Sequence, residues 1–128
     1  MRYIGIDFGK KRIGLAMSDE EGLLAFPKAT LSNGPAVSAE IADIARRSGV
    51  DTIIIGESRD FGGRANTILE DSNLLARKLE NLGFEVVFEE EYSSSVEAVK
   101  FQGNTEHIDA SAAAIILQRF LDKKRNNK

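Results

Sequence analysis

The chain has 128 residues, enough for one domain with a substantial core but few for two lobes. Hydrophobic residues make up 42% and charged residues 29%, and no apolar stretch approaches the roughly 20 residues of a membrane span. The absence of cysteine excludes disulfides and thiolate metal sites, and the net charge of -3 lacks the basic excess usual for duplex-binding domains. With no signal-peptide pattern at the N-terminus, we expect a cytoplasmic domain over residues 1–122 and a flexible basic tail over residues 123–128.

Alternating side chains predict two strands at the start of the chain. In the run of residues 2–8, bulky apolar residues fill positions 4, 6 and 8, so Asp7 points to the opposite face. Residues 13–18 alternate in the same way between bulky and small side chains, and the short link between the two runs predicts a hairpin. We expect a third strand over residues 23–30, where Pro27 restricts it to a sheet edge or an irregular position.

The middle of the chain alternates between helical and strand patterns. Ser38 is a candidate N-cap for a helix whose apolar stripe stops before Gly49. Residues 50–56 form a short run rich in isoleucine, which predicts a strand buried on both faces. A second helix is expected to end at Gly83, and residues 84–92 predict a fifth strand.

The C-terminal third is predicted to be helical. Ser94 and Glu97 form a capping-box pattern that begins a short helix, and a last helix is expected over residues 108–121. Three successive strands, followed by alternating helices and strands, predict an α/β fold with a five-stranded mixed sheet. Its first three strands would be antiparallel, its fourth and fifth strands parallel, and helices would cover its faces.

Three acidic residues are predicted to converge at one edge of this sheet. Asp7 ends a central strand, where open α/β sheets place their ligands. Glu91 lies at the end of the fifth strand in a run of three glutamates, and strand register alone does not choose among them. Asp109 lies on the inward stripe of the last helix. Converging carboxylates repel one another, so this arrangement indicates a divalent cation such as Mg²⁺ or Mn²⁺.

Two basic groups could draw a phosphate backbone toward these acids, although basic residues are also typical of solvated hairpin tips and loops. They consist of Lys10, Lys11, Arg12, Arg59 and Arg64.

Four segments resemble the YqgF/RuvX family of the RNase H-like superfamily, bacterial proteins described as Holliday junction resolvases and as nucleases that mature pre-16S ribosomal RNA. The segments are "IGIDFGKKRIGLA", "IIIGESRDFGG", "EEYSSSVEA" and "HIDASAAAIILQRFL". The resemblance implies an RNase H-like fold with Asp7, Glu91 and Asp109 as catalytic metal ligands. Glu57 is a candidate fourth ligand, because related resolvases place a glutamate at the corresponding strand end.

The resemblance implies a Mg²⁺-dependent or Mn²⁺-dependent nuclease, a monomer or homodimer, acting on precursor ribosomal RNA or branched DNA and not on membranes. Tyr92 stands where the family usually has arginine, which favours an alternative: an inactive nucleic-acid or ribosome-assembly binding module of the same fold. A third reading, a relative of actin-type ATPases, lacks the second lobe and second phosphate loop.

Overall fold

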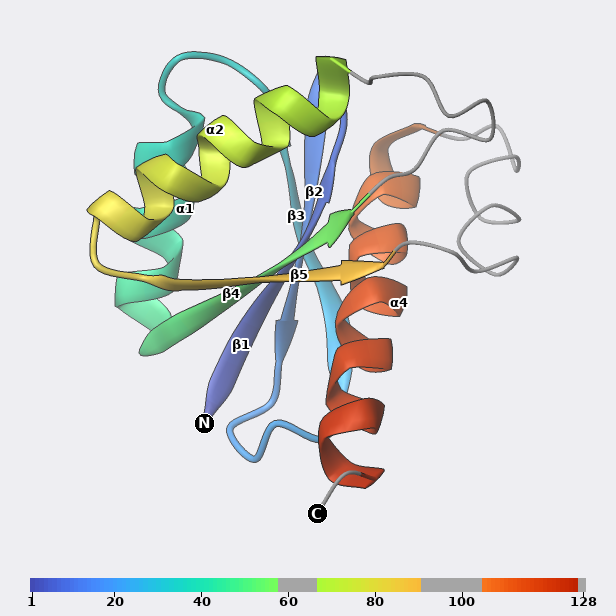
Figure 1. Cartoon of the computed structure of the whole chain (residues 1–128). Helices are drawn as coiled ribbons and strands as arrows, with labels where there is room; N and C mark the ends of the chain where they lie inside the picture. The colour runs from blue at the N-terminus through green and yellow to red at the C-terminus, as the bar shows by residue number, and fades with distance from the viewer. Residues whose placement is uncertain (58–66, 91–104, 127–128) are drawn as a thin grey trace.

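The computed structural model describes residues 1–57, 67–90 and 105–126 (Figure 1). Their five strands form one sheet in the order β3-β2-β1-β4-β5. β2 is antiparallel to β1 and to β3, whereas β4 is parallel to β1 and to β5. The strands are β1 (Arg2–Phe8), β2 (Arg12–Ser18), β3 (Ala25–Ser32), β4 (Val50–Glu57) and β5 (Glu85–Glu90). The predicted five-stranded mixed sheet is therefore confirmed.

Helices cover both faces of the sheet. The described residues contain α1 (Val37–Ser48), α2 (Thr67–Asn81) and α4 (Thr105–Asn126). Figure 1 shows α1 and α2 on one face and α4 on the other. The last turn of α4 includes residues 123–126, which we expected in the tail. None of these described helices has the length and apolarity needed to cross a membrane.

Some predicted features lie outside the described residues or differ at their ends. The capping box of Ser94 and Glu97 falls outside the described part of the chain. The prediction that Ser38 caps α1 is wrong, because the N-cap is Ala36 and makes no side-chain capping bond. The helix begins at Val37, whose buried side chain belongs to the core, so packing sets this boundary. The predicted end of α1 is confirmed, since Gly49 adopts a left-handed conformation with φ of 70°.

The edge strand β3 begins two residues later than the sequence suggested. The Asp19 carboxylate accepts hydrogen bonds from the backbone N–H groups of Leu23 and Leu24, so these residues belong to the turn before the strand. The same bonds hold the pKa of Asp19 below its ordinary value. Pro27 lies on the edge strand as predicted.

Strand alternation divides the core into two layers. Ile4 and Ile6 of β1 belong to the cluster on the side of α1 and α2. Tyr3 belongs instead to the cluster formed with Leu117 of α4. Asp7 has the same parity as Tyr3, which puts it on the α4 side of the sheet, where it is only 3% exposed.

One polar side chain of α4 anchors the helix to the start of β3. The Gln118 side-chain oxygen accepts a hydrogen bond of 2.8 Å from the backbone N–H of Ala25. Its amide nitrogen donates to the backbone oxygen of Leu23 at 2.9 Å. Since both the oxygen and the nitrogen of the Gln118 side-chain amide are engaged, this contact fixes α4 along its own axis as well as against the sheet.

α4 approaches the sheet closely because two strand positions have no side chain. A Cβ atom added to Gly5 of β1 would lie 2.6 Å from Leu117 Cβ and 3.0 Å from the Ala113 backbone oxygen. A Cβ added to Gly56 of β4 would lie 2.5 Å from Ile116 Cδ1. The helix therefore occupies the space that side chains at these glycines would need.

We expect Gly5→Ala to lower the free energy of unfolding by about 1 to 3 kcal/mol, because the added methyl group must displace α4. Gly56→Ala should cost less, since the Ile116 Cδ1 atom it meets is the end of a flexible side chain. Gly34→Ala is the control, with nothing within 4 Å of the added Cβ. Urea unfolding of the three variants measures the order of these free-energy costs. Equal costs at Gly5 and Gly34 would contradict this packing.

Candidate functional site

α4 runs antiparallel to β1, and its contacts bring its first turns toward Asp7. The Tyr3 ring meets the Phe120 ring at 5.5 Å between centroids, whereas Gly5 meets Leu117 and the preceding turn. Two residues of a strand advance about 6.6 Å, and four residues of a helix advance about 6 Å. One more step of this pattern along the strand and the helix would bring the turn that begins at Asp109 to the level of Asp7. The Asp109 side chain itself lies outside the description.

Asp7 lies in a row of residues across the sheet in which both of its neighbours are glycines. It pairs with Gly14 of β2, which in turn pairs with Thr30 of β3. The next step of the β1–β4 register pairs Asp7 with Gly56, and Gly56 pairs with Glu89 of β5. No side chain therefore projects from the strand positions on either side of Asp7.

Glu89 is a buried acid with a basic partner. Its side chain is 8% exposed, and its Oε1 atom lies 2.5 Å from Lys123 Nζ near the end of α4. The sequence analysis left open which of three glutamates is functional, and this ion pair gives Glu89 a structural role. We missed the pair because Lys123 was expected in a flexible tail.

Several of the other predicted site residues belong to parts of the chain outside the described ranges. Glu91, Arg59 and Arg64 lie outside the described residues, as does the side chain of Glu57, whose backbone ends β4. Among the side chains that are described, no group of three histidine, cysteine or acidic residues could hold a metal ion. The metal trio therefore stays a prediction, for which Asp7 and the placement of α4 are the described parts.

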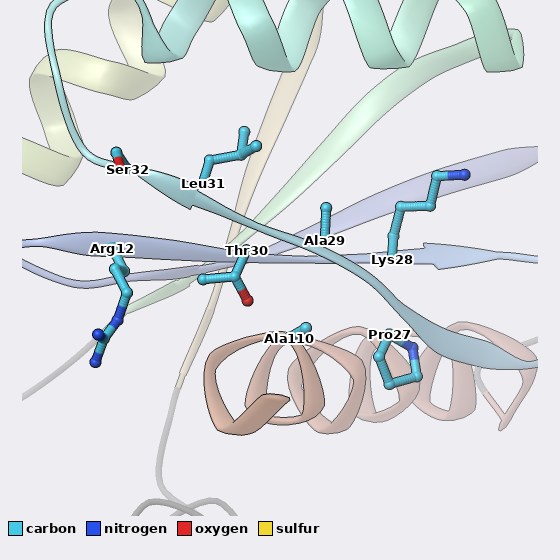
Figure 2. A pocket seen from close by; sticks show the side chains of 8 residues that line it. All are labelled: Arg12, Pro27, Lys28, Ala29, Thr30, Leu31, Ser32 and Ala110. Carbon is cyan, nitrogen blue, oxygen red and sulfur yellow. The ribbon is translucent and has the colours of Figure 1, made fainter. Parts of the chain in front are cut away.

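The basic residues after β1 divide between two faces of the sheet. Lys10, Lys11 and Arg12 are all exposed. Arg12 lines a groove of about 450 Å³ between β3 and α4, where Figure 2 shows its side chain on the α4 side. Lys10 lines a second cavity of about 290 Å³ beside α1 and α2. A substrate that used all three residues would have to contact both faces near Asp7.

Asn33 holds the hairpin tip in place and is a residue that the sequence analysis missed. Its side-chain amide donates to the Gly9 backbone oxygen at 2.8 Å. Its backbone N–H donates to the Lys11 oxygen at 2.9 Å. The sequence marks Asn33 only as part of a turn, because its partners lie more than twenty residues earlier in the chain.

Comparison with known proteins identifies the family. Residues 1–123 match the family model described as "RuvX: Holliday junction resolvase". The chain belongs to the RuvX family. It is 35% identical to a protein of Geobacillus kaustophilus named "Putative pre-16S rRNA nuclease", over 98% of this chain and 100% of that relative. A Fusobacterium nucleatum relative of the same name is 32% identical over 97% of this chain and 99% of its own length.

Solved structures confirm the fold of this RuvX family member. Thermus thermophilus RuvC is similar with a TM-score of 0.64 and 14% identity, covering 98% of this chain and 97% of RuvC. The Fowlpox virus resolvase, solved with substrate Holliday junction DNA, has a TM-score of 0.62 and 12% identity, covering 97% of this chain and 99% of the resolvase. Identities this low show the shared RNase H-like fold alone.

We expect Lys123→Met to lower the free energy of unfolding by about 1 to 3 kcal/mol, because it leaves the buried Glu89 carboxylate without its charged hydrogen bond. Adding Glu89→Gln should recover part of this loss, since no buried charge then remains. Arg125→Met is a matched control, because Arg125 pairs with Asp122 at the exposed surface and should cost under about 1 kcal/mol. Chemical denaturation measures all three, and equal costs for the Lys123 and Arg125 variants would contradict the role of Glu89.

Proposed function

We propose that this RuvX family member is a nuclease that hydrolyses phosphodiester bonds in structured nucleic acid. Its relatives are named for pre-16S rRNA processing, and its family for Holliday junction resolution. We propose both substrates for this chain, namely the 5′ end of precursor 16S ribosomal RNA and branched DNA.

The observation that carries the proposal is the position of Asp7. Asp7 is almost completely buried at the end of a central strand. Extending the contacts of α4 along β1 by one step would bring the turn that begins at Asp109 to the level of Asp7. A cation between Asp7 and Asp109 would suit this place, because neighbouring carboxylates repel one another unless a positive charge lies between them. The end of a central strand is also the sheet edge where α/β proteins bind their ligands.

Glu91 completes the site that we propose. Val87 belongs to the cluster on the α4 side, and Glu89 reaches Lys123 of α4, so alternate residues of β5 face this helix. The same alternation, carried on for one more step, would put Glu91 on the side of Asp7 and Asp109. Glu57 follows Gly56 at the end of the neighbouring strand and remains our candidate for a fourth ligand.

The donors in this set suit Mg²⁺ or Mn²⁺, which prefer carboxylate oxygens and retain bound water. We propose that Asp7, Glu91 and Asp109 hold the metal. When bound, such ions activate a water molecule and stabilise negative charge on the phosphate. Lys10, Lys11 and Arg12 would attract the sugar-phosphate backbone and orient it over Asp7. We propose the same role for Arg59 and Arg64.

We expect Asp7→Asn to reduce cleavage roughly 100-fold or more, since even outer partners of metal ligands can cost 10- to 100-fold. Labelled precursor 16S ribosomal RNA and a labelled four-way DNA junction are the substrates, each with Mg²⁺, Mn²⁺ or a chelator. Asp43→Asn is the matched control, because Asp43 is an exposed acid of α1 that pairs with Arg47. Glu57→Gln tests the fourth ligand in the same assay.

The outcomes separate the proposed functions. Cleavage that requires a divalent ion and is lost in Asp7→Asn, but not in Asp43→Asn, supports the nuclease. Full activity of Asp7→Asn would contradict the proposed metal site. Tight binding to either substrate without cleavage under any metal condition would instead indicate the inactive binding module.

A further inference from the structure

We propose that the groove between β3 and the start of α4 binds the phosphodiester backbone of the substrate strand beside the point of cleavage. The proposal rests on the proposed nuclease function and adds a binding surface to it. We call this surface the β3 groove and define it by Arg12, Thr30, Ser32 and Ala110 (Figure 2).

The polar groups of the β3 groove suit phosphate. Arg12 is an exposed residue whose guanidinium group carries a positive charge, and it pairs across the strands with Ser32. Figure 2 shows the Arg12 and Thr30 side chains on the α4 side of the sheet. A guanidinium group with neighbouring hydroxyls is a common set of donors to the oxygens of a nucleic-acid backbone.

The β3 groove adjoins the proposed metal site. Thr30, Gly14 and Asp7 are consecutive partners in one row of the sheet, so Thr30 lies two strand spacings, or about 10 Å, from Asp7. Gly14 has no side chain to separate them. The opposite wall of the groove includes Ala110, which directly follows Asp109 in α4. A strand whose phosphate reaches Asp7 can therefore continue into the groove.

The end of the groove that carries Arg12 is held in position by the protein itself. Asn33 directly follows β3 and bonds to the backbone of Gly9 and Lys11 in the hairpin tip. These bonds fix the tip, and with it Arg12, against the end of the edge strand. A backbone that is held in place before binding loses less conformational freedom when its side chains meet phosphate.

The same edge is unsuited to a protein strand. β3 is the edge of the described sheet, and another strand could add only by pairing with its backbone. Pro27 lacks the N–H group that such pairing needs. Lys28 is skipped in the pairing with β2, since Ala29 pairs with Leu15 and Pro27 with Ala16. Proline, lysine and a bulge disfavour strand addition, so we assign the groove to nucleic acid.

Fluorescence anisotropy tests this assignment with the Asp7→Asn protein and with labelled single-stranded RNA and DNA of one sequence. Thr30→Val combined with Ser32→Ala should weaken binding about tenfold, the effect of losing a charge-assisted hydrogen bond. Arg12→Ala should lower the salt slope of binding by roughly 1. Arg77→Ala is the matched control, because Arg77 is an exposed arginine of α2, on the opposite face of the sheet from α4.

We expect the double variant to lose affinity for RNA and for DNA equally, because the phosphates are common to both. A loss confined to RNA would overturn a backbone site, as would unchanged affinity in the double variant or equal effects of Arg12→Ala and Arg77→Ala. Thr30→Ser keeps the hydroxyl and should bind normally, and thermal unfolding checks that each variant is folded. The same double substitution is also made in the protein that retains Asp7. If that protein cleaves its substrates and the double variant binds them unchanged, the groove proposal is refuted and the nuclease proposal stands.

Discussion

The candidate site depends on the close contact of α4 with two glycines of the sheet. Gly5 and Gly56 leave the space that the side chains of α4 fill, and a methyl group at either position would meet atoms of the helix. Gln118 then fixes the position of the helix along its own axis through two hydrogen bonds. Because the helix is held at its middle, the height of its first turn relative to Asp7 is determined by helix geometry.

The packing of α4 on the sheet also affects what surrounds Asp7 on each side. The row that contains Asp7 has glycines on both sides, then Thr30 toward one edge and Glu89 toward the other. On the β5 side, Ile116 fills the space above Gly56, and Lys123 neutralises Glu89. On the β3 side, a groove with polar residues adjoins the row. Among the described residues, the two sides of Asp7 are therefore different, and the β3 side carries the groove that suits phosphate.

The sequence predicted the features that follow from local periodicity. Alternation along residues 2–8 gave the correct faces of β1, Gly49 marked the end of α1, and Pro27 marked the edge strand. It failed where distant contacts decide the outcome. Ser38 has the chemistry of a helix cap, yet burial of Val37 sets the start of α1. The roles of Glu89, Asn33 and Thr30 come from partners in other elements, which no local pattern can reveal.

The most direct test of this account is a crystal structure of the protein grown with Mn²⁺, in which anomalous scattering locates the ion. The account predicts an ion coordinated by the carboxylates of Asp7 and Asp109, beside the point where α4 crosses the end of β1. It would be contradicted by an ion bound elsewhere while Asp7 has none, or by a helix whose residue 109 is displaced by a turn or more from the level of Asp7.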